Sequence, residues 1–174
     1  VALAPDSLYA VKWDMHEPSR LVLISEKREN NKGESKKREN EKRLTSLGHI
    51  NGSPVTNGGK IFWTEKVPSI RWELESYSVL KCFDAKTGKV TKLTKRGILC
   101  SPAFSPGGDT LAMAEYFAAG GSSLHLFNST NMEKISSFPA PHNGQIKEVL
   151  FMGKKIYASV IAEEGIALFA LEPV

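Results

Sequence analysis

One short phrase recurs along this chain and limits its fold more than any other feature. The clearest copy, residues 101–113, reads Ser-Pro-Ala-Phe-Ser-Pro-Gly-Gly-Asp-Thr-Leu-Ala-Met, which predicts a strand, a tight turn and a second strand. Three looser copies lie at residues 3–11, 53–63 and 149–158. The matching positions in the four copies are Tyr9, Ile61, Leu111 and Ile156. They are separated by 52, 50 and 45 residues, so the chain is built from a repeated unit.

Repeats of about 40 to 50 residues, each with several short strands, are typical of β-propeller blades. The sequence therefore predicts an all-β fold: a β-propeller of about four blades, each a four-stranded antiparallel sheet, with incomplete terminal blades. A chain of 174 residues, 41% of them hydrophobic, can bury one sizeable core. We expect residues 1–174 to form a single propeller domain or part of one. The approximate blades are 1–45, 46–94, 95–138 and 139–174.

The strand pattern is clearest in the third repeat, where alternation and turn residues predict strands at 99–104, 110–117, 123–128 and 133–138. The first repeat has almost no innermost strand, and the fourth has no outermost strand. Open sheet edges favour aggregation. We therefore expect a longer native polypeptide, with the missing strands supplied by another segment or another chain.

The positive charge is concentrated in one stretch. The formal net charge is +4, and residues 26–43 contribute +3 of it. A nucleic-acid-binding propeller would need basic residues across a face, so we expect no nucleic-acid partner. The stretch itself is compatible with a short solvated helix, through the i, i+4 pairs Glu34/Arg38 and Glu39/Arg43, or with a disordered loop. No apolar run reaches the length of a membrane helix, so we expect no membrane insertion.

Residues 101–112 resemble the repeat of TolB-like, WD-repeat-like bacterial propellers, which reads Ser-Pro-x-Phe-Ser-Pro-Asp-Gly-x-x-Leu-Ala. The Leu-Thr pairs at 44–45 and 93–94 precede repeats, as in that family, and residues 84–89 are similar to its Asp-x-x-Thr-Gly-Glu turn. Gly107 departs from the family pattern, which has Asp there. The resemblance implies the propeller architecture for most of the chain, but propellers serve many unrelated functions.

A second resemblance is narrower. Residues 63–73 and 77–78 are similar to one blade of large, uncharacterised envelope proteins that carry a TolB-like propeller beside other domains, in some cases a metallopeptidase-like one. This resemblance implies a periplasmic or cell-envelope location. It also implies that any catalytic residues lie outside this chain.

The sequence contains no recognisable motif for a catalytic, cofactor or metal site. The chain has no Gly-x-Ser-x-Gly elbow, Walker loop or dinucleotide fingerprint, and its four histidines lack metal-ligand spacing. We therefore assign no catalytic residue, cofactor or metal ligand. For Cys82 and Cys100 we expect two buried free thiols, with a disulfide in an oxidising compartment as the alternative.

The strongest candidate for binding is the long connection 66–76 within the second repeat. It carries Trp72 between Arg71 and Glu73, and Trp and Arg are enriched at binding hot spots. The competing interpretation is that Trp72 packs over the edge of its blade while Arg71 pairs with a carboxylate. Connections from second to third strand share a face with those that enter the next repeat, so His49 and His142 belong to the same loop-rich face. His125 alternates with leucines, and we expect it to point outward from its strand.

These observations predict a non-enzymatic propeller module that binds a protein, peptide or glycan on its loop-rich face. The alternative is a substrate-gating or regulatory propeller of a larger, peptidase-like hydrolase whose catalytic domain is outside this chain. A structural spacer in an envelope assembly is a third, weaker hypothesis.

Overall fold

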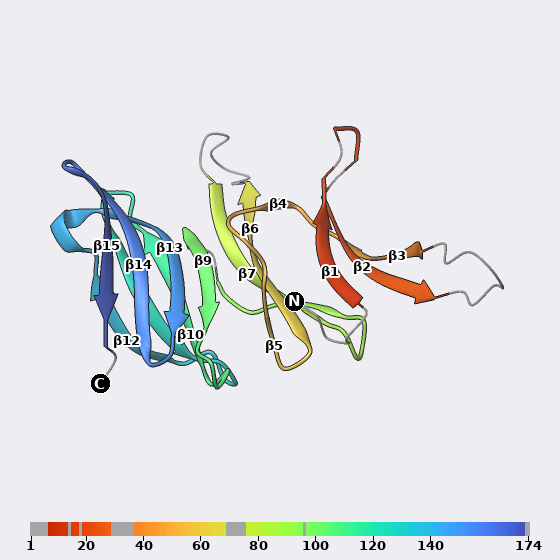
Figure 1. The fold of residues 1–174 in the computed structure, drawn as a ribbon. Helices are drawn as coiled ribbons and strands as arrows, with labels where there is room; N and C mark the ends of the chain where they lie inside the picture. The colour runs from red at the N-terminus through yellow and green to blue at the C-terminus, as the bar shows by residue number, and fades with distance from the viewer. Residues whose placement is uncertain are drawn as a thin grey trace. The chain divides into compact units, whose positions relative to one another are not determined.

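A computed structural model describes residues 7–13, 15–17, 19–28, 37–68, 76–95 and 97–172 of the chain. These residues form antiparallel β-sheets and one short 3₁₀ helix (Figure 1). The all-β prediction is confirmed. The chain divides into two compact units, residues 1–49 and 50–174, and each is described by itself.

The first unit contains one sheet, in which β1 (Ser7–Lys12), β2 (Arg20–Arg28) and β3 (Lys37–Ser46) pair in that order. The predicted helix or disordered loop at 26–43 is wrong for the residues described there. Strand β2 continues to Arg28, and β3 begins at Lys37, opposite it in the register. An i, i+4 ion pair contributes only about 0.2–0.5 kcal/mol to the stability of a helix. The pairing of β2 with β3, which starts beside the buried Leu21, outweighs that contribution. Residues 29–36 lie outside the described part.

The second sheet contains β4 (His49–Ile50), β5 (Val55–Asn57), β6 (Lys60–Pro68), β7 (Ser76–Asp84) and β8 (Val90–Lys92). Its order is β4-β6-β7-β8, and β5 pairs with β6 as well. The turn between β5 and β6 falls on the predicted Asn-Gly-Gly, where Gly58 and Gly59 both have positive φ.

The third sheet has the four strands expected of a complete blade, in the order β12-β11-β10-β9. They are β9 (Leu99–Phe104), β10 (Thr110–Tyr116), β11 (Ser122–Asn128) and β12 (Lys134–Pro139). The fourth sheet has three strands, β13 (Gln145–Met152), β14 (Lys155–Ala162) and β15 (Gly165–Leu171). The 3₁₀ helix η1 (Pro141–Asn143) links the two sheets. The predicted blade limits remain a prediction.

The third sheet is covered on both faces, and this packing forms the core of the second unit. On one face, Leu124 and Leu126 pack with Ile146 and Val160 of the fourth sheet. On the other face, Leu111 and Met113 pack against side chains of the second sheet. The buried residues of this second apolar cluster are Phe62, Leu80, Cys82, Leu99, Leu111 and Met113. Sheets that stack face to face in this way bury apolar residues at successive strand positions.

This double coverage overturns the prediction that His125 points outward. His125 is only 4% exposed, and its Nε2 lies 2.9 Å from Glu115 Oε2. Alternation with Leu124 does place His125 on the opposite face of β11, as the sequence indicates. That face is covered as well, which alternation within one strand cannot reveal.

Both cysteines are free and buried, as expected. Cys82 belongs to the core between the second and third sheets, whereas Cys100 belongs to the core between the third and fourth. Burial raises the pKa of both thiols. The two thiols therefore act as small apolar core groups rather than as a disulfide.

Equivalent turns repeat the same bonds in successive sheets. The Asp84 carboxylate accepts bonds from the amides of Lys86 and Thr87, at 2.9 and 3.0 Å. Asn128 Oδ1 accepts in the same way from the amides two and three residues further on, at 2.9 and 3.3 Å. These bonds, with that from Thr87 the largest cause, lower the pKa of Asp84. The expected Asp-x-x-Thr-Gly turn is thus present, and it has a counterpart one repeat later.

Candidate functional site

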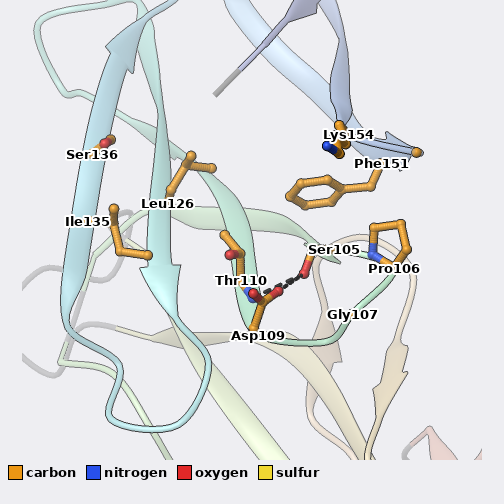
Figure 2. A pocket seen from close by; sticks show the side chains of 11 residues that line it. Ser105, Pro106, Gly107, Asp109, Thr110, Leu126, Ile135, Ser136, Phe151 and Lys154 are labelled. Atoms are coloured by element: carbon orange, nitrogen blue, oxygen red, sulfur yellow. Dashed lines mark hydrogen bonds between the residues drawn. The ribbon is translucent and has the colours of Figure 1, made fainter. Parts of the chain in front are cut away.

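A pocket of about 610 Å³ opens between the third and fourth sheets (Figure 2). It lies within the second unit, at the end where β9 turns into β10 and β13 turns into β14. Its volume falls within the range of about 300–1,000 Å³ that is common for ligand sites. The lining residues are Ser105, Pro106, Gly107, Asp109, Thr110, Leu126, Ile135, Ser136, Phe151, Gly153 and Lys154.

One wall of the pocket is the tight turn of the repeated phrase. Ser105 Oγ donates to Asp109 Oδ1 at 2.6 Å and accepts from the Thr110 amide at 3.1 Å. The bond from Ser105 is the largest cause that lowers the pKa of the Asp109 carboxyl. Gly108, with φ +75°, closes the turn by donating its amide to the Ser105 carbonyl. The polar groups of this wall therefore satisfy one another, and Asp109 carries a fixed negative charge at the rim.

The remaining walls are largely apolar. Figure 2 shows Leu126 and Ile135 on one side of the pocket, with Phe151 and Lys154 on the other. The side chain of Ile135 is 57% exposed, although isoleucine is normally buried. A register shift in the pairing of β11 with β12 lies beside it. In the described part of the chain, Lys154 forms no ion pair, so it provides a positive charge opposite Asp109.

The pocket offers an apolar interior with one carboxylate and one ammonium group at its rim. The lining residues include no histidine or cysteine, so Ser105 has no imidazole within the pocket to accept its proton. Across the described residues, no group of three or more His, Cys, Asp or Glu side chains is placed to hold a metal ion.

The residues predicted to form the binding loop, Arg71, Trp72 and Glu73, lie outside the described part of the chain. The strands that lead into and out of this loop are described. Near them, Glu65 Oε2 accepts from Trp63 Nε1 at 3.1 Å, and Glu65 Oε1 accepts from Lys81 Nζ at 2.6 Å. This pairing fixes a buried carboxylate at the base of the loop, and the role of Trp72 remains a prediction.

The two predicted histidines are exposed, and neither lines the pocket. His49 is the last residue of the first unit, whereas His142 belongs to the second. His142 lies in η1 with φ +53°, next to Asn143 with φ +51°. Two consecutive non-glycine residues with positive φ are uncommon, and such conformations are concentrated at functional sites. The place of His49 and His142 on a shared binding face stays a prediction.

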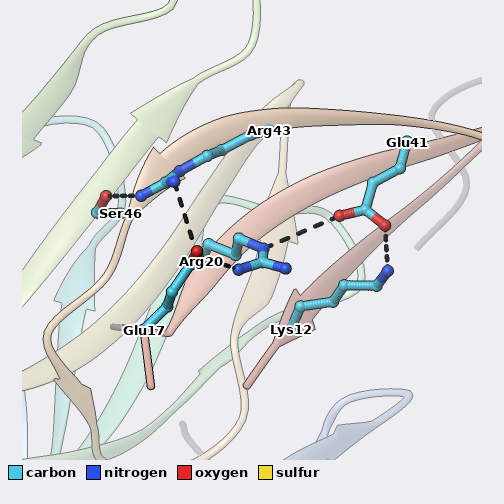
Figure 3. A network of polar contacts seen from close by, with 6 residues as sticks. All are labelled: Lys12, Glu17, Arg20, Glu41, Arg43 and Ser46. Atoms are coloured by element: carbon cyan, nitrogen blue, oxygen red, sulfur yellow. Dashed lines mark hydrogen bonds and ion pairs between the residues drawn. The ribbon is translucent and has the colours of Figure 1, made fainter. Parts of the chain in front are cut away.

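A network of charged side chains covers part of the first sheet (Figure 3). Glu41 pairs with Lys12 and lies 3.9 Å from Arg20 Nε. Glu17 pairs with Arg20 at 2.5 Å and lies 3.9 Å from Arg43. Among the described residues, two carboxylates thus hold three cations together on this sheet.

The sequence did not indicate the pocket. The tight turn within residues 101–113 and the looser copy at residues 149–158 both belong to the predicted repeat. These two turns lie close together because of the way the third and fourth sheets pack. The spacing of residues along the chain does not predict that packing. The nearest signal was Ile135, an apolar residue in a short strand rich in serine.

No family model and no curated protein sequence matches this chain. Solved structures do resemble it. TolB from Acinetobacter baumannii is 14% identical with a TM-score of 0.59, over 97% of this chain and 41% of that one. The β-propeller domain of the Trilobed protease from Pyrococcus furiosus is 13% identical with a TM-score of 0.53, over 96% of this chain and 51% of that one. An acylaminoacyl peptidase from Pyrococcus horikoshii is 11% identical with a TM-score of 0.51, over 97% of this chain and 31% of that one.

At these identities the likeness shows the fold alone. The chain has a β-propeller fold of the kind found in TolB, and the predicted architecture is confirmed. The chain spans about half the length of the Trilobed protease propeller domain and less than half the length of the other two structures. No helix in the described residues is long and apolar enough to cross a membrane.

Proposed function

Given this propeller fold, we propose that the chain is a non-enzymatic interaction module that binds an apolar segment of a protein or peptide in the pocket between its third and fourth sheets. One observation carries the proposal: a pocket of about 610 Å³ whose lining includes the apolar side chains of Ile135, Phe151 and Leu126. Rigid sheets hold these side chains in place, so little ordering is needed on binding.

The chemistry of the pocket favours a protein or peptide over a glycan. Sugars need several polar groups that are free to form hydrogen bonds, and here Ser105, Asp109 and the Thr110 amide already bond to one another. An apolar side chain would gain about 25 cal/mol for each Å² that it buries. The opposite charges of Asp109 and Lys154 would orient the backbone or neighbouring side chains of the bound segment.

Two alternatives from the sequence remain open. The loop-rich face with Arg71, Trp72, Glu73, His49 and His142 is a second candidate surface for the same kind of partner. A gating role within a peptidase-like hydrolase is the second candidate function, since the fold is shared by such propellers. A location in the periplasm or cell envelope is part of the proposal and rests on the sequence resemblance.

Peptides selected from a random dodecapeptide display library on the immobilised chain would test the proposal. The affinity of one labelled peptide is measured for the wild type and for Ser136→Trp, which fills the pocket. Ser137→Trp is the matched control, because Ser137 is the exposed neighbour on the same strand. We expect Ser136→Trp to weaken binding about tenfold or more, and Ser137→Trp less than about twofold.

A Trp72→Ala variant distinguishes the two surfaces. A loss of affinity in Trp72→Ala, with Ser136→Trp unaffected, would move the site to the loop-rich face and contradict the pocket. Turnover of fluorogenic peptides by the purified chain would contradict the non-enzymatic assignment.

A further inference from the structure

The two charged side chains of the pocket come from equivalent places in the repeat. Among the residues that line the pocket, Asp109 and Lys154 are the ones that carry a charge. Asp109 lies two residues before Leu111, and Lys154 lies two residues before Ile156, which is the matching position of the next repeat. The third repeat therefore presents a carboxylate to the pocket, and the fourth repeat presents an ammonium group.

The turn that carries Lys154 also has backbone amides without partners. Met152 at the end of β13 pairs with Lys155 at the start of β14, so Gly153 and Lys154 form a two-residue hairpin turn. Gly153 has φ +60°, which suits glycine as the first central residue of such a turn. Within the described part of the chain, the amides of Gly153 and Lys154 donate to no other group, and both residues line the pocket. This turn therefore offers backbone donors and a positive charge to an anion.

The opposite wall of the pocket disfavours an anion. Two of its amides are already bonded within their own turn, since Gly108 donates to the Ser105 carbonyl at 2.8 Å and Thr110 donates to Ser105 Oγ at 3.1 Å. Asp109 adds a carboxylate to this wall, and like charges repel. An anionic group that enters the pocket is therefore directed to Lys154.

An apolar contact and the positive charge lie on the same hairpin. Phe151 precedes Lys154 by three residues, and Figure 2 shows both side chains on one side of the pocket. A ligand that uses both must carry its apolar group beside its anion. In a C-terminal apolar residue, the side chain and the carboxylate are attached to one Cα. In an extended internal segment, neighbouring side chains point to opposite sides, so an acidic residue next to the apolar one would point away from this wall.

On the basis of the pocket function proposed above, on which this inference depends, we propose that the pocket binds the C-terminal end of a partner protein. The apolar side chain of the last residue lies beside Phe151, and the terminal carboxylate is held by Lys154 and the free amides of its turn. Capture of a terminal carboxylate by backbone amides is a recurring mode of peptide recognition. Hydrogen bonds between a charged donor and a carboxylate are about twice as strong as neutral ones.

A set of fluorescein-labelled hexapeptides tests the need for a free terminus. Each reads Gly-Ser-Gly-Ser-Ser followed by Val, Leu, Ile, Met, Phe or Trp, and each is prepared both with a free C-terminal carboxylate and as the C-terminal amide. Fluorescence polarisation measures their affinity for the full chain at physiological ionic strength. For the peptide that binds best, we expect the amide to bind about tenfold more weakly than the acid. Equal affinities of the two forms, or no binding of any free acid, would overturn the proposal.

Two lysine variants identify the group that holds the carboxylate. Lys154→Gln should lower the affinity for the free acid about tenfold and leave the affinity for the amide within about twofold. Lys155→Gln is the matched control, because it removes the same charge from the next residue, which pairs with Glu172 at 2.7 Å and does not line the pocket. It should leave both affinities within about twofold. Equal losses of free-acid affinity in the two variants would indicate general attraction to positive charge and would overturn the proposal.

The Ser136→Trp variant separates failure of this proposal from failure of the pocket. We expect it to weaken binding of the free acid about tenfold or more. If acid and amide bind the wild type equally and Ser136→Trp weakens both, the pocket takes an internal segment and the terminal assignment alone is wrong. If Ser136→Trp binds the free acid as the wild type does, the site lies elsewhere and both proposals are wrong.

Discussion

At the scale of single residues, two adjacent glycines of the repeated turn have different roles. Gly108 has φ +75°, its carbonyl accepts from Asn57 Nδ2 at 2.6 Å, and a Cβ there would overlap the Asn57 amide. Gly107 lacks positive φ, and a Cβ there would meet Asp109 at an ordinary 3.5 Å. We predict that Gly108→Ala lowers the free energy of unfolding by about 2 kcal/mol or more. Gly107→Ala should stay within about 0.5 kcal/mol of the wild type, or be slightly stabilising.

Urea denaturation of both variants measures the difference. Equal losses in the two variants would show that the backbone of this turn is not fixed as described. A loss in Gly107→Ala alone would place the strained position one residue earlier.

His125 makes stability depend on pH. Burial is the largest cause that lowers its pKa, Lys134 adds to the effect, and Glu115 opposes it. As the pH falls below the ordinary histidine pKa of about 6.5, the unfolded chain binds a proton that the folded chain resists. Stability should therefore decrease as the pH is lowered from 7 toward 5.

The His125→Gln variant should lose less stability than the wild type over that range, and the exposed His49→Gln should behave as the wild type. Thermal melts at a series of pH values provide the measurement. A wild type that becomes more stable on acidification would contradict the buried, neutral imidazole.

At the scale of elements, hydroxyl groups link one sheet to the next at equivalent positions. Ser78 Oγ donates to the Leu99 carbonyl at 2.5 Å, which joins the second sheet to the third. Ser122 Oγ donates to the Gly144 carbonyl and accepts from the Ile146 amide, both at 2.9 Å, which joins the third sheet to the fourth. These serines occupy the start of the third strand in successive repeats. They are therefore part of the repeat, although no spacing of apolar residues marks them.

We predict that Ser122→Ala lowers the free energy of unfolding by about 1–3 kcal/mol, because a buried amide and a buried carbonyl lose their partner. The exposed Ser137→Ala should change it by less than about 0.5 kcal/mol. Chemical denaturation compares the two. A neutral Ser122→Ala would mean that water replaces the hydroxyl at the junction.

The elements also show where sequence analysis succeeds. Strand β9 was predicted with its observed bounds, because Pro and Gly turns delimit the apolar run on one side and the Leu-Thr repeat signal precedes it. The stretch 26–43 was misassigned because i, i+4 charge pairs fit a helix, whereas strand pairing is set by residues far along the chain. His125 was misplaced because alternation identifies two faces without telling which of them is covered.

At the scale of the whole molecule, repetition makes the architecture predictable and leaves the binding surface unpredictable. Four copies of one phrase indicate stacked sheets. The pocket arises where the turn at Ser105 approaches the turn at Lys154, and the two are almost fifty residues apart. Propeller folds are shared by proteins with unrelated functions, so the site must be established from its own residues.

The central claim is that a partner segment enters the pocket between the third and fourth sheets. The most direct measurement is an NMR titration of the isotopically labelled chain with a peptide selected on it. We expect the methyl signals of Leu126 and Ile135 to shift together with the ring signals of Phe151, while the indole signal of Trp72 stays in place. Shifts at Trp72 with unchanged signals from the three pocket residues would contradict it.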